Sequence, residues 1–253
     1  MGKLRLRYRL VILVTGVFLL LPAPCFSSQS LVAVIEVWPP FRIESPKSPH
    51  GFTGIDIDIL DGLAKHLGCN IEVQRHPFAR GLEMIRAGKA DLTTGIAHTE
   101  ARAEFIRYVP TSYFAVTPVF YTQTGRGDIV STYNDLYRYK IGYSIYSAYF
   151  EPFNSDTGLD KIGISTEEQL IKMVALGRID LIIGTHPNLA WDIKRYGFKD
   201  RVEQVRYIPP KTTPIFFGLT RKKDNTRLQQ EIDQYLNQIM TNGELDTIIQ
   251  AYQ

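Results

Sequence analysis

The sequence GKADLTTG at residues 88–95 returns as GRIDLIIG at residues 177–184. Each copy follows a run of helical character, at 78–87 and at 166–176, and continues from a glycine into a short apolar stretch and a second glycine. Glycine is favoured just past a helix, where the chain turns left-handed, and the run after it has strand length. Four of the eight positions are identical, which chance could produce, but the matching helical runs favour repetition. The repeat predicts two similar α/β lobes whose post-strand loops face each other as a clamp.

Strand-like and helix-like runs alternate along the rest of the first lobe. Residues 54–68 predict an amphipathic helix, because apolar residues recur every four positions and a glycine ends the run. In this interpretation Asp56 takes one of the polar positions. Strands are expected at 31–37 and 71–75, and a second helix at 79–87. This alternation predicts an α/β fold with a parallel sheet covered on both faces.

Two longer strands are expected to connect the lobes. Residues 113–121 are rich in aromatic and β-branched side chains, and a polar loop follows them. Residues 215–220 have the same character and return the chain to the first lobe, where two helices end it. The expected domains are a signal peptide at 1–27, the first part of lobe I at 28–121, lobe II at 122–211 and the return to lobe I at 212–253.

The first residues read as a targeting segment. A basic start precedes an apolar run at 10–21 and a short stretch rich in small residues, which is the layout of a secretory signal peptide. The run is shorter than the ~20 residues that span a bilayer. Cleavage is expected after Ser27, giving an exported protein of the periplasm. Cys25 could instead be lipidated, but the prolines before it make a poor lipidation motif, so an unlipidated protein is expected.

Charge and motif content exclude several functions. The 29 Lys and Arg residues include four in the signal, which leaves 25 against 26 Asp and Glu and a net charge of about −1. Nothing therefore indicates binding to nucleic acid or to anionic membranes. The five histidines are scattered without metal-ligand spacing, and no nucleotide-binding or hydrolase motif is present. Neither a metal nor a cofactor is expected, and the protein is expected to be a monomer.

The residues after the first copy of the repeat form a candidate anion receptor. Thr99 is suited to cap a helix whose first turn contains Arg102. A helix N-terminus and a guanidinium together can hold a carboxylate. Spacing alone equally allows an ordinary surface arginine that pairs with Glu100 or Glu104.

Short motifs stand in a set order along the mature chain: Pro39-Pro40-Phe41, Gly51-Phe52-Thr53-Gly54-Ile55-Asp56, Gly88-Lys89-Ala90-Asp91, Thr99-x-x-Arg102, Asn134-Asp135-Leu136, Gly177-Arg178-Ile179-Asp180, Phe217-Gly218-Leu219 and an ending around Asn242-Gly243. This set resembles the family 3 extracellular solute-binding proteins, the polar-amino-acid type of ABC importers. The resemblance covers essentially the whole mature chain. It implies a two-lobe periplasmic-binding-protein fold of type II, with a hinge and an interlobe ligand cleft.

The resemblance also implies roles for particular residues. Arg102 takes the ligand carboxylate, with backbone help near Gly95 and Ala97. Family members usually have an acid for the ligand ammonium directly after the second repeated strand, where this chain has Thr185. The loop containing Ser147 also departs from the family pattern. Glu36, at the end of the first strand, is an alternative source of negative charge, although such a residue is often only solvated.

Three more residues are candidates for the cleft. Trp38 and Phe41 follow the first parallel strand, and ligands of open α/β sheets bind outside the carboxyl ends of strands. Arg80 lies in a first helical turn, where a cation is mildly unfavourable, so it could face an anion in the cleft or be solvated.

The expected function is non-enzymatic. The protein captures a small carboxylate-bearing solute, an amino acid or a related molecule, and presents it to the membrane permease of an ABC transporter. A ligand sensor for a receptor or kinase uses the same closure and is an alternative. A dehydratase-like enzyme is a weaker one, because an acid or base is wanted where Thr185 stands.

Overall fold

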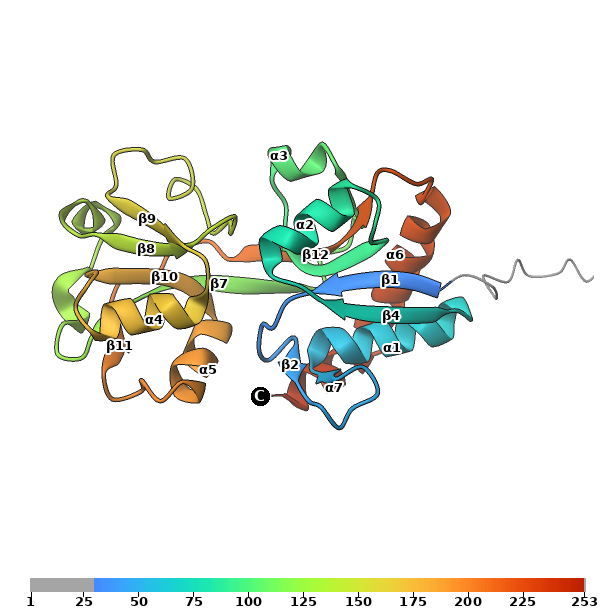
Figure 1. Ribbon diagram of the computed structural model, residues 1–253, viewed down its shortest axis with the longest axis horizontal. Helices are drawn as coiled ribbons and strands as arrows, with labels where there is room; N and C mark the ends of the chain where they lie inside the picture. Colours follow the sequence, from blue (N-terminus) through green and yellow to red (C-terminus); the bar gives the residue numbers. More distant parts are fainter. Residues whose placement is uncertain (1–29, 253) are drawn as a thin grey trace, which may run out of the picture.

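The structure, a computed structural model, describes residues 30–252, so the expected signal peptide lies outside the described residues. Two α/β lobes lie side by side, joined by the long strands β7 (Phe114–Gln123) and β12 (Thr213–Thr220) (Figure 1). No helix in the described part of the chain is long and apolar enough to cross a membrane.

Lobe I contains both ends of the described chain. Its strands and helices alternate as expected from the sequence and then end in a pair of consecutive helices. They are β1 (Ser30–Ile35), β2 (Ile43–Glu44), β3 (Phe52–Thr53), α1 (Ile55–Leu67), β4 (Asn70–Arg75), α2 (Phe78–Arg86), β5 (Leu92–Ala97), α3 (Glu100–Ala103), β6 (Ile106–Tyr108), α6 (Thr226–Thr241) and α7 (Glu244–Gln250).

Lobe II is the smaller unit inserted between the two crossing strands. It consists of short strands, two α-helices and two 3-10 turns. They are η1 (Gly127–Ile129), η2 (Tyr133–Arg138), β8 (Ile141–Ser144), β9 (Lys161–Ile164), α4 (Glu167–Ala175), β10 (Leu181–His186), α5 (Asn188–Arg195) and β11 (Val202–Gln204).

One continuous sheet runs through both lobes in the order β4-β1-β5-β12-β7-β10-β8-β9. The outer strands of each lobe pair in parallel, as the alternation of strands and helices predicts. The two crossing strands are antiparallel to their neighbours, because each passes between the lobes in the opposite direction to the other. In β7, residues 114–116 pair with β12 of lobe I and Thr117 onwards with β10 of lobe II. The chain thus crosses between the lobes inside β7, near Thr117.

The repeated phrase forms the same structure twice. It spans α2 to β5 in lobe I and α4 to β10 in lobe II. Gly88 and Gly177 follow the two helices with φ of +71° and +68°, the left-handed conformation that favours glycine. Each then leads directly into a buried strand.

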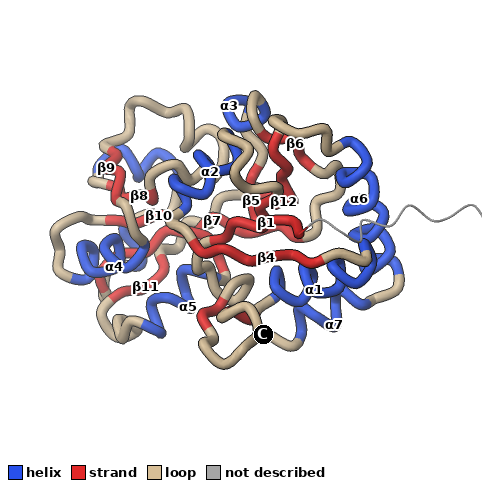
Figure 2. The backbone as a smooth tube through the Cα atoms, turned by 45° about the vertical axis from the view of Figure 1, so that its right-hand side comes forward, coloured by secondary structure: helices blue, strands red, loops and turns tan. Residues whose placement is uncertain are grey.

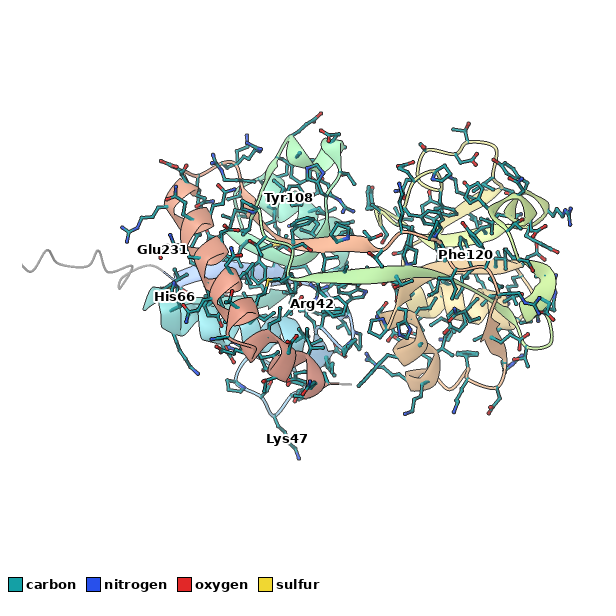
Figure 3. The ribbon with its side chains drawn as sticks, turned by 180° about the vertical axis from the view of Figure 1, so that it is seen from behind. Arg42, Lys47, His66, Tyr108, Phe120 and Glu231 are labelled. Atoms are coloured by element: carbon teal, nitrogen blue, oxygen red, sulfur yellow. The ribbon has the colours of Figure 1, made fainter. Side chains whose placement is uncertain are left out.

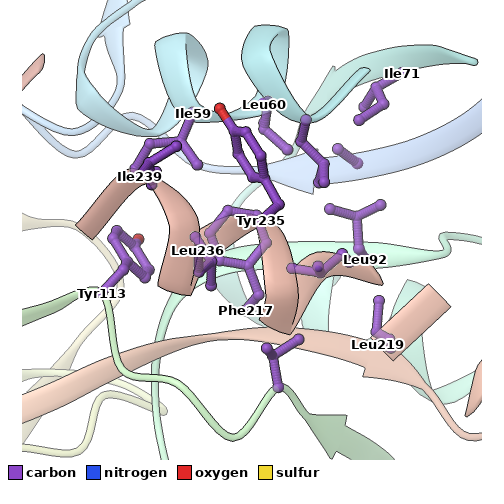
Figure 4. Packing of buried hydrophobic residues seen from close by; sticks show 14 of the residues in the cluster. Ile59, Leu60, Ile71, Leu92, Tyr113, Phe217, Leu219, Tyr235, Leu236 and Ile239 are labelled. Atoms are coloured by element: carbon purple, nitrogen blue, oxygen red, sulfur yellow. The ribbon is translucent and has the colours of Figure 1, made fainter. Parts of the chain in front are cut away.

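Helices cover both faces of the sheet in lobe I. α1, α6 and α7 pack on one face and α2 on the other (Figure 2). Figure 4 shows the larger core, where Leu60, Phe217 and Leu236 meet from a helix, a strand and a helix. In lobe II, α4 and α5 cover one face, while aromatic side chains around Phe120 fill the other (Figure 3). Burial of these apolar side chains is the main contribution to the folding stability of each lobe.

Candidate ligand site between the lobes

A cavity of about 250 Å³ lies between the lobes. Lobe I lines it with the loop after β1, the end of β5 and the residues of α2 and α3. Lobe II lines it with the loop after β8, the start of α4, the end of β10 and part of α5. The cavity therefore sits at the carboxyl ends of the parallel strands of both lobes, where open α/β sheets bind their ligands.

Arg102 is the buried cation of this cavity, with only 7% of its surface exposed. Its Nη1 donates to the backbone carbonyl of Ala97 at 2.8 Å, and its Nη2 donates to the carbonyl of Tyr146 in lobe II. The guanidinium carbon lies 5.3 Å from the ring centroid of Phe78. Burial lowers the pKa of Arg102, and the neighbouring Tyr108 opposes that shift. A guanidinium has five N–H donors, so these bonds leave donors for a ligand.

Thr99 positions Arg102 and does not line the main cavity. Its side chain caps α3 by accepting a hydrogen bond from the Arg102 backbone N–H at 3.2 Å. Because α3 is a single turn of four residues, its dipole is small. The guanidinium of Arg102, rather than the helix N-terminus, is the strong anion-binding group here.

A second buried arginine, Arg42, forms the floor beside Trp38. Its Nη1 donates to Asp56 Oδ2 at 2.9 Å and to the carbonyl of Thr94 at 2.8 Å. Asp56 is fully buried and also accepts from the Tyr113 hydroxyl at 2.7 Å. The interpretation of Asp56 as one of the helix's polar positions was therefore wrong, because this network draws its carboxylate into the core. No local sequence pattern marks Arg42 or Asp56 as a residue of the site.

The two aromatic candidates differ in whether they reach the cavity. Trp38 lines the cavity and stacks on Phe41 with ring centroids 4.4 Å apart. Phe41 itself is fully buried in the core of lobe I and does not line the cavity. Arg80 also lies outside the cavity, because it is on the exposed side of α2. The residue of α2 that does reach the cavity is Phe78.

Four other candidates do line the cavity. Gly95 and Ala97 lie at the end of β5, and Ser147 and Thr185 face them from lobe II. Gly95 has a φ of +64°, and a Cβ there would lie 2.8 Å from Arg42 Nη1 and 3.0 Å from Trp38 Cζ3. Thr185 is buried at the end of β10.

Acidic side chains also line the cavity. Sequence analysis missed two of them, Glu167 at the start of α4 and Asp192 in α5, whereas Glu36, the alternative acid it named, does line the cavity just after β1. Burial raises the pKa of all three carboxyls, and the negative charges of Asp192 and Glu36 raise that of Glu167 further. The repeat could have revealed Glu167, because Phe78 holds the matching first position of α2 and lines the same cavity.

Comparison with known families agrees with this architecture. The model of the bacterial extracellular solute-binding proteins, family 3, matches residues 31–253. The chain belongs to this family. This solute-binding protein is also 21% identical over 206 residues to the probable amino-acid-binding protein YxeM of Bacillus subtilis strain 168, covering 79% of this chain and 75% of the relative.

Solved structures share the fold of this solute-binding protein. An amino acid ABC transporter substrate-binding protein from Streptococcus pneumoniae, bound to L-arginine, has a TM-score of 0.75 and 21% identity, covering 88% of this chain and 93% of that one. A histidine kinase sensor domain with similarity to periplasmic binding proteins has a TM-score of 0.77 and 14% identity, covering 89% and 96%. The family consists of solute-binding proteins, and the Streptococcus pneumoniae neighbour is named as a substrate-binding protein. Within residues 30–252, no group of three or more His, Cys, Asp or Glu side chains is placed to hold a metal ion.

Proposed function

We propose that this solute-binding protein captures an amino acid or a closely related carboxylate-bearing solute between its lobes and delivers it to the permease of an ABC importer. The family membership supports solute binding outside the cytoplasmic membrane. The relatives named as amino-acid-binding support the ligand class.

The observation that best supports a carboxylate-bearing ligand is the burial of the Arg102 guanidinium at the cavity. Lobe I buries two arginines at the cavity, and Arg42 has Asp56 as its ion-pair partner at 2.9 Å. Arg102 has no carboxylate within ion-pair distance among residues 30–252, and its guanidinium contacts backbone carbonyls and the Phe78 ring. A buried cation without a directly paired anion is costly, and a ligand carboxylate relieves that cost.

The remaining groups suit a small amphipathic ligand. The Trp38 and Phe78 side chains offer apolar contact, and the hydroxyl groups of Ser147 and Thr185 offer hydrogen bonds from lobe II. Because the lining comes from both lobes, a ligand that touches both walls favours the closed arrangement.

Isothermal titration calorimetry with the standard amino acids, their carboxyl-amidated forms and small organic acids tests this proposal. A ligand should bind the wild-type protein and lose at least tenfold in affinity on amidation or on Arg102→Ala substitution, because breaking a buried charged pair typically costs 2–5 kcal/mol. Arg80→Ala is the matched control, since Arg80 is exposed and outside the cavity. Full-strength binding by Arg102→Ala would overturn the carboxylate role.

Delivery, sensing and catalysis are separated by different readouts. Deletion of the gene should abolish uptake of the labelled ligand by the cell that encodes it. A sensor would leave uptake intact and change gene expression or kinase activity instead. Recovery of the ligand chemically unchanged after incubation with the protein separates binding from a dehydratase-like activity.

The proposal includes export with cleavage after Ser27 and no lipid on Cys25. Intact-mass analysis of the mature protein decides this point. A mass that includes Cys25 with a diacylglycerol group would contradict it.

A further inference from the structure

We propose that the hydrogen bond from Arg102 to the backbone carbonyl of Tyr146 is an interlobe latch. It keeps part of the ligand-free protein closed, and a ligand carboxylate displaces the carbonyl from Arg102. The displacement step rests on the proposed function, because it takes Arg102 as the carboxylate site. The latch itself needs no ligand, so it can be tested whatever the protein binds.

The contact between Arg102 and Tyr146 joins the two lobes. Arg102 lies in α3 of lobe I, whereas Tyr146 belongs to the turn after β8, on the side of lobe II that faces lobe I (Figure 1). Arg102 Nη2 donates to the Tyr146 carbonyl, while Nη1 donates to the carbonyl of Ala97 within lobe I. A hydrogen bond from a charged donor is stronger than one between neutral groups. Because the arginine is buried, water competes little for this bond.

Tyr146 adopts a backbone conformation that is unfavourable for a tyrosine. Its φ is +66°, and in the part of the chain that the structure describes every other residue with a positive φ is a glycine. The Cβ atom makes this left-handed region costly, and such strain persists only where the surroundings compensate for it. The side chain does not supply that compensation, because it is 62% exposed.

Backbone contacts therefore hold the turn in this conformation. Within lobe II, the Ser147 N–H closes the turn by donating to the Ser144 carbonyl at 3.1 Å, and the Ile145 N–H donates to the Ile164 carbonyl at 3.0 Å. Both of these bonds join neutral groups. The stronger, charge-assisted bond comes from Arg102 across the cleft, and it breaks when the lobes separate. The strain at Tyr146 is therefore better compensated in the closed protein than in the open one.

A ligand carboxylate can replace the Tyr146 carbonyl. Ala97 lies in the same lobe as Arg102, so its bond to Nη1 does not depend on closure, whereas Nη2 is free to exchange Tyr146 for the ligand. A carboxylate is the stronger acceptor, because it carries a full charge. The displaced turn has space to move, since Tyr146 lines a second interlobe cavity of about 520 Å³. The ligand thus exchanges one contact that closes the lobes for another.

Double electron–electron resonance on the ligand-free mature protein tests the latch. Nitroxide labels on Lys47→Cys in lobe I and Lys199→Cys in lobe II report the separation of the lobes, because both lysines are exposed. Cys69→Ala removes the native free thiol. Unfolding and dialysis before labelling remove any ligand carried through purification. We expect a distance distribution with both a closed and an open component.

Removal of the donor should open the ligand-free protein. Arg102→Ala should lower the closed-to-open ratio by about tenfold or more, because hydrogen bonds of charged groups are stronger than neutral ones. Arg195→Ala is the matched control, since it also removes an arginine that contacts the other lobe, but its pair with Glu44 is exposed. At 1 M salt the exposed pair is screened, so the control should change the ratio by less than about twofold.

Substitutions of Tyr146 separate the backbone contact from the ring. Tyr146→Gly removes the cost of the left-handed conformation and should raise the closed-to-open ratio by roughly five- to thirtyfold. Tyr146→Ala retains that cost and loses only the exposed ring, so the ratio should stay within about threefold of the wild type. Tyr146→Val should lower the ratio, because a β-branched residue is especially unfavourable at positive φ. If the wild type is almost fully closed, the valine variant carries this part of the test.

Two outcomes would overturn the latch. One is a ligand-free wild type that is open throughout, or that has the same distance distribution as Arg102→Ala. The other is a set of Tyr146 variants that change the melting temperature but not the distances, since the turn would then be equally strained in both states. If Arg102→Ala fails to fold, the Tyr146 series decides alone.

These outcomes are distinguishable from failure of the proposed function. The latch is measured without ligand, so its failure leaves the calorimetric evidence for carboxylate binding intact. The proposed function fails instead if no carboxylate-bearing solute binds, or if Arg102→Ala binds one at full strength.

Discussion

Asp91 and Asp180 hold equivalent positions in the two lobes and make the same contact. Asp91 Oδ2 accepts a hydrogen bond from the backbone N–H of Val32 at 2.9 Å, at the start of β1. Asp180 Oδ2 accepts one from the backbone N–H of Lys140 at 3.0 Å, just before β8. In each lobe the aspartate of the repeated phrase therefore ties its strand to the neighbouring parallel strand, so the repetition reflects a requirement of the fold and not of the ligand.

Asp91 and Asp180 are equivalent in position but differ in burial, so replacing each by alanine should destabilise the protein to a different extent. Asp91→Ala should lower the free energy of unfolding by about 2–3 kcal/mol, because it removes a charge-assisted hydrogen bond at a buried site and the ion pair with Lys223 at 2.7 Å. Asp180→Ala should cost about 1 kcal/mol or less, because its side chain is 40% exposed and screened by solvent.

Urea unfolding measures both losses. Trp38 in lobe I and Trp191 in lobe II report on the two lobes by fluorescence. Asp91→Asn retains an acceptor and should recover part of the loss. Equal destabilisation by the two alanine variants would contradict the prediction.

The elements of the fold that sequence reasoning predicted are those governed by local patterns. The apolar spacing and terminal glycine of α1 and the β-branched composition of β7 are properties of short segments. The residue at which β7 changes its partner from β12 to β10 is set by strands far away in sequence, so no local pattern marks it.

Gly95 offers a test of how closely the cavity floor is packed. Gly95→Ala should lower the free energy of unfolding by about 2–4 kcal/mol, because it adds a clash with Arg42 and Trp38 to an unfavourable φ. The clash should displace Trp38, and because Trp38 lines the cavity, ligand binding should weaken as well. Thermal melts and calorimetry measure the two effects.

Gly125→Ala is the matched control for that substitution. Gly125 has a φ of +87°, and a Cβ there would contact nothing within 4 Å, so only the backbone term of about 1 kcal/mol is expected. Equal losses for the two variants would show that the Trp38 and Arg42 contacts do not constrain Gly95.

Closure of the lobes should depend only weakly on the ion pair between them. Arg195 Nη2 lies 3.3 Å from Glu44 Oε2 across the cleft, and both side chains are more than a third exposed. Such pairs are worth about 0.2–1 kcal/mol, so Arg195→Ala should weaken ligand binding by less than about fivefold. The effect should vanish at 1 M salt.

Lys194→Ala, the neighbouring residue of α5, removes the same charge without touching Glu44 and controls for that effect. Small-angle scattering should show a smaller radius of gyration on ligand saturation in the wild type and in both variants. A wild-type radius unchanged at saturation would contradict hinge closure, provided that the ligand-free protein is not already closed.

Sequence reasoning predicted the part of the candidate site that lies in one short motif and missed residues that come together only in the fold. Arg102 with its Thr99 cap could be identified from four consecutive residues. Glu167 and Asp192 lie on different helices, and only the packing of α4 against α5 brings them into one cavity. Phe41 was selected for its position after β1, but it is drawn into the core because Trp38 covers it.

The acidic pair should also make the ligand-free protein less stable as pH rises. Glu167 and Asp192 have raised pKa values in the folded protein, so the folded state binds their proton more tightly than the unfolded state does. The free energy of unfolding should therefore fall above pH 4.5, by at most about 1.4 kcal/mol per pH unit for one proton. Glu167→Gln should flatten this slope between pH 5 and 8, although Glu36 and Asp58, whose pKa values are also raised, keep part of it. Urea unfolding at unit pH steps, with Asp200→Asn as control, measures the slopes; identical slopes for wild type and Glu167→Gln would mean that the pair is ionised throughout.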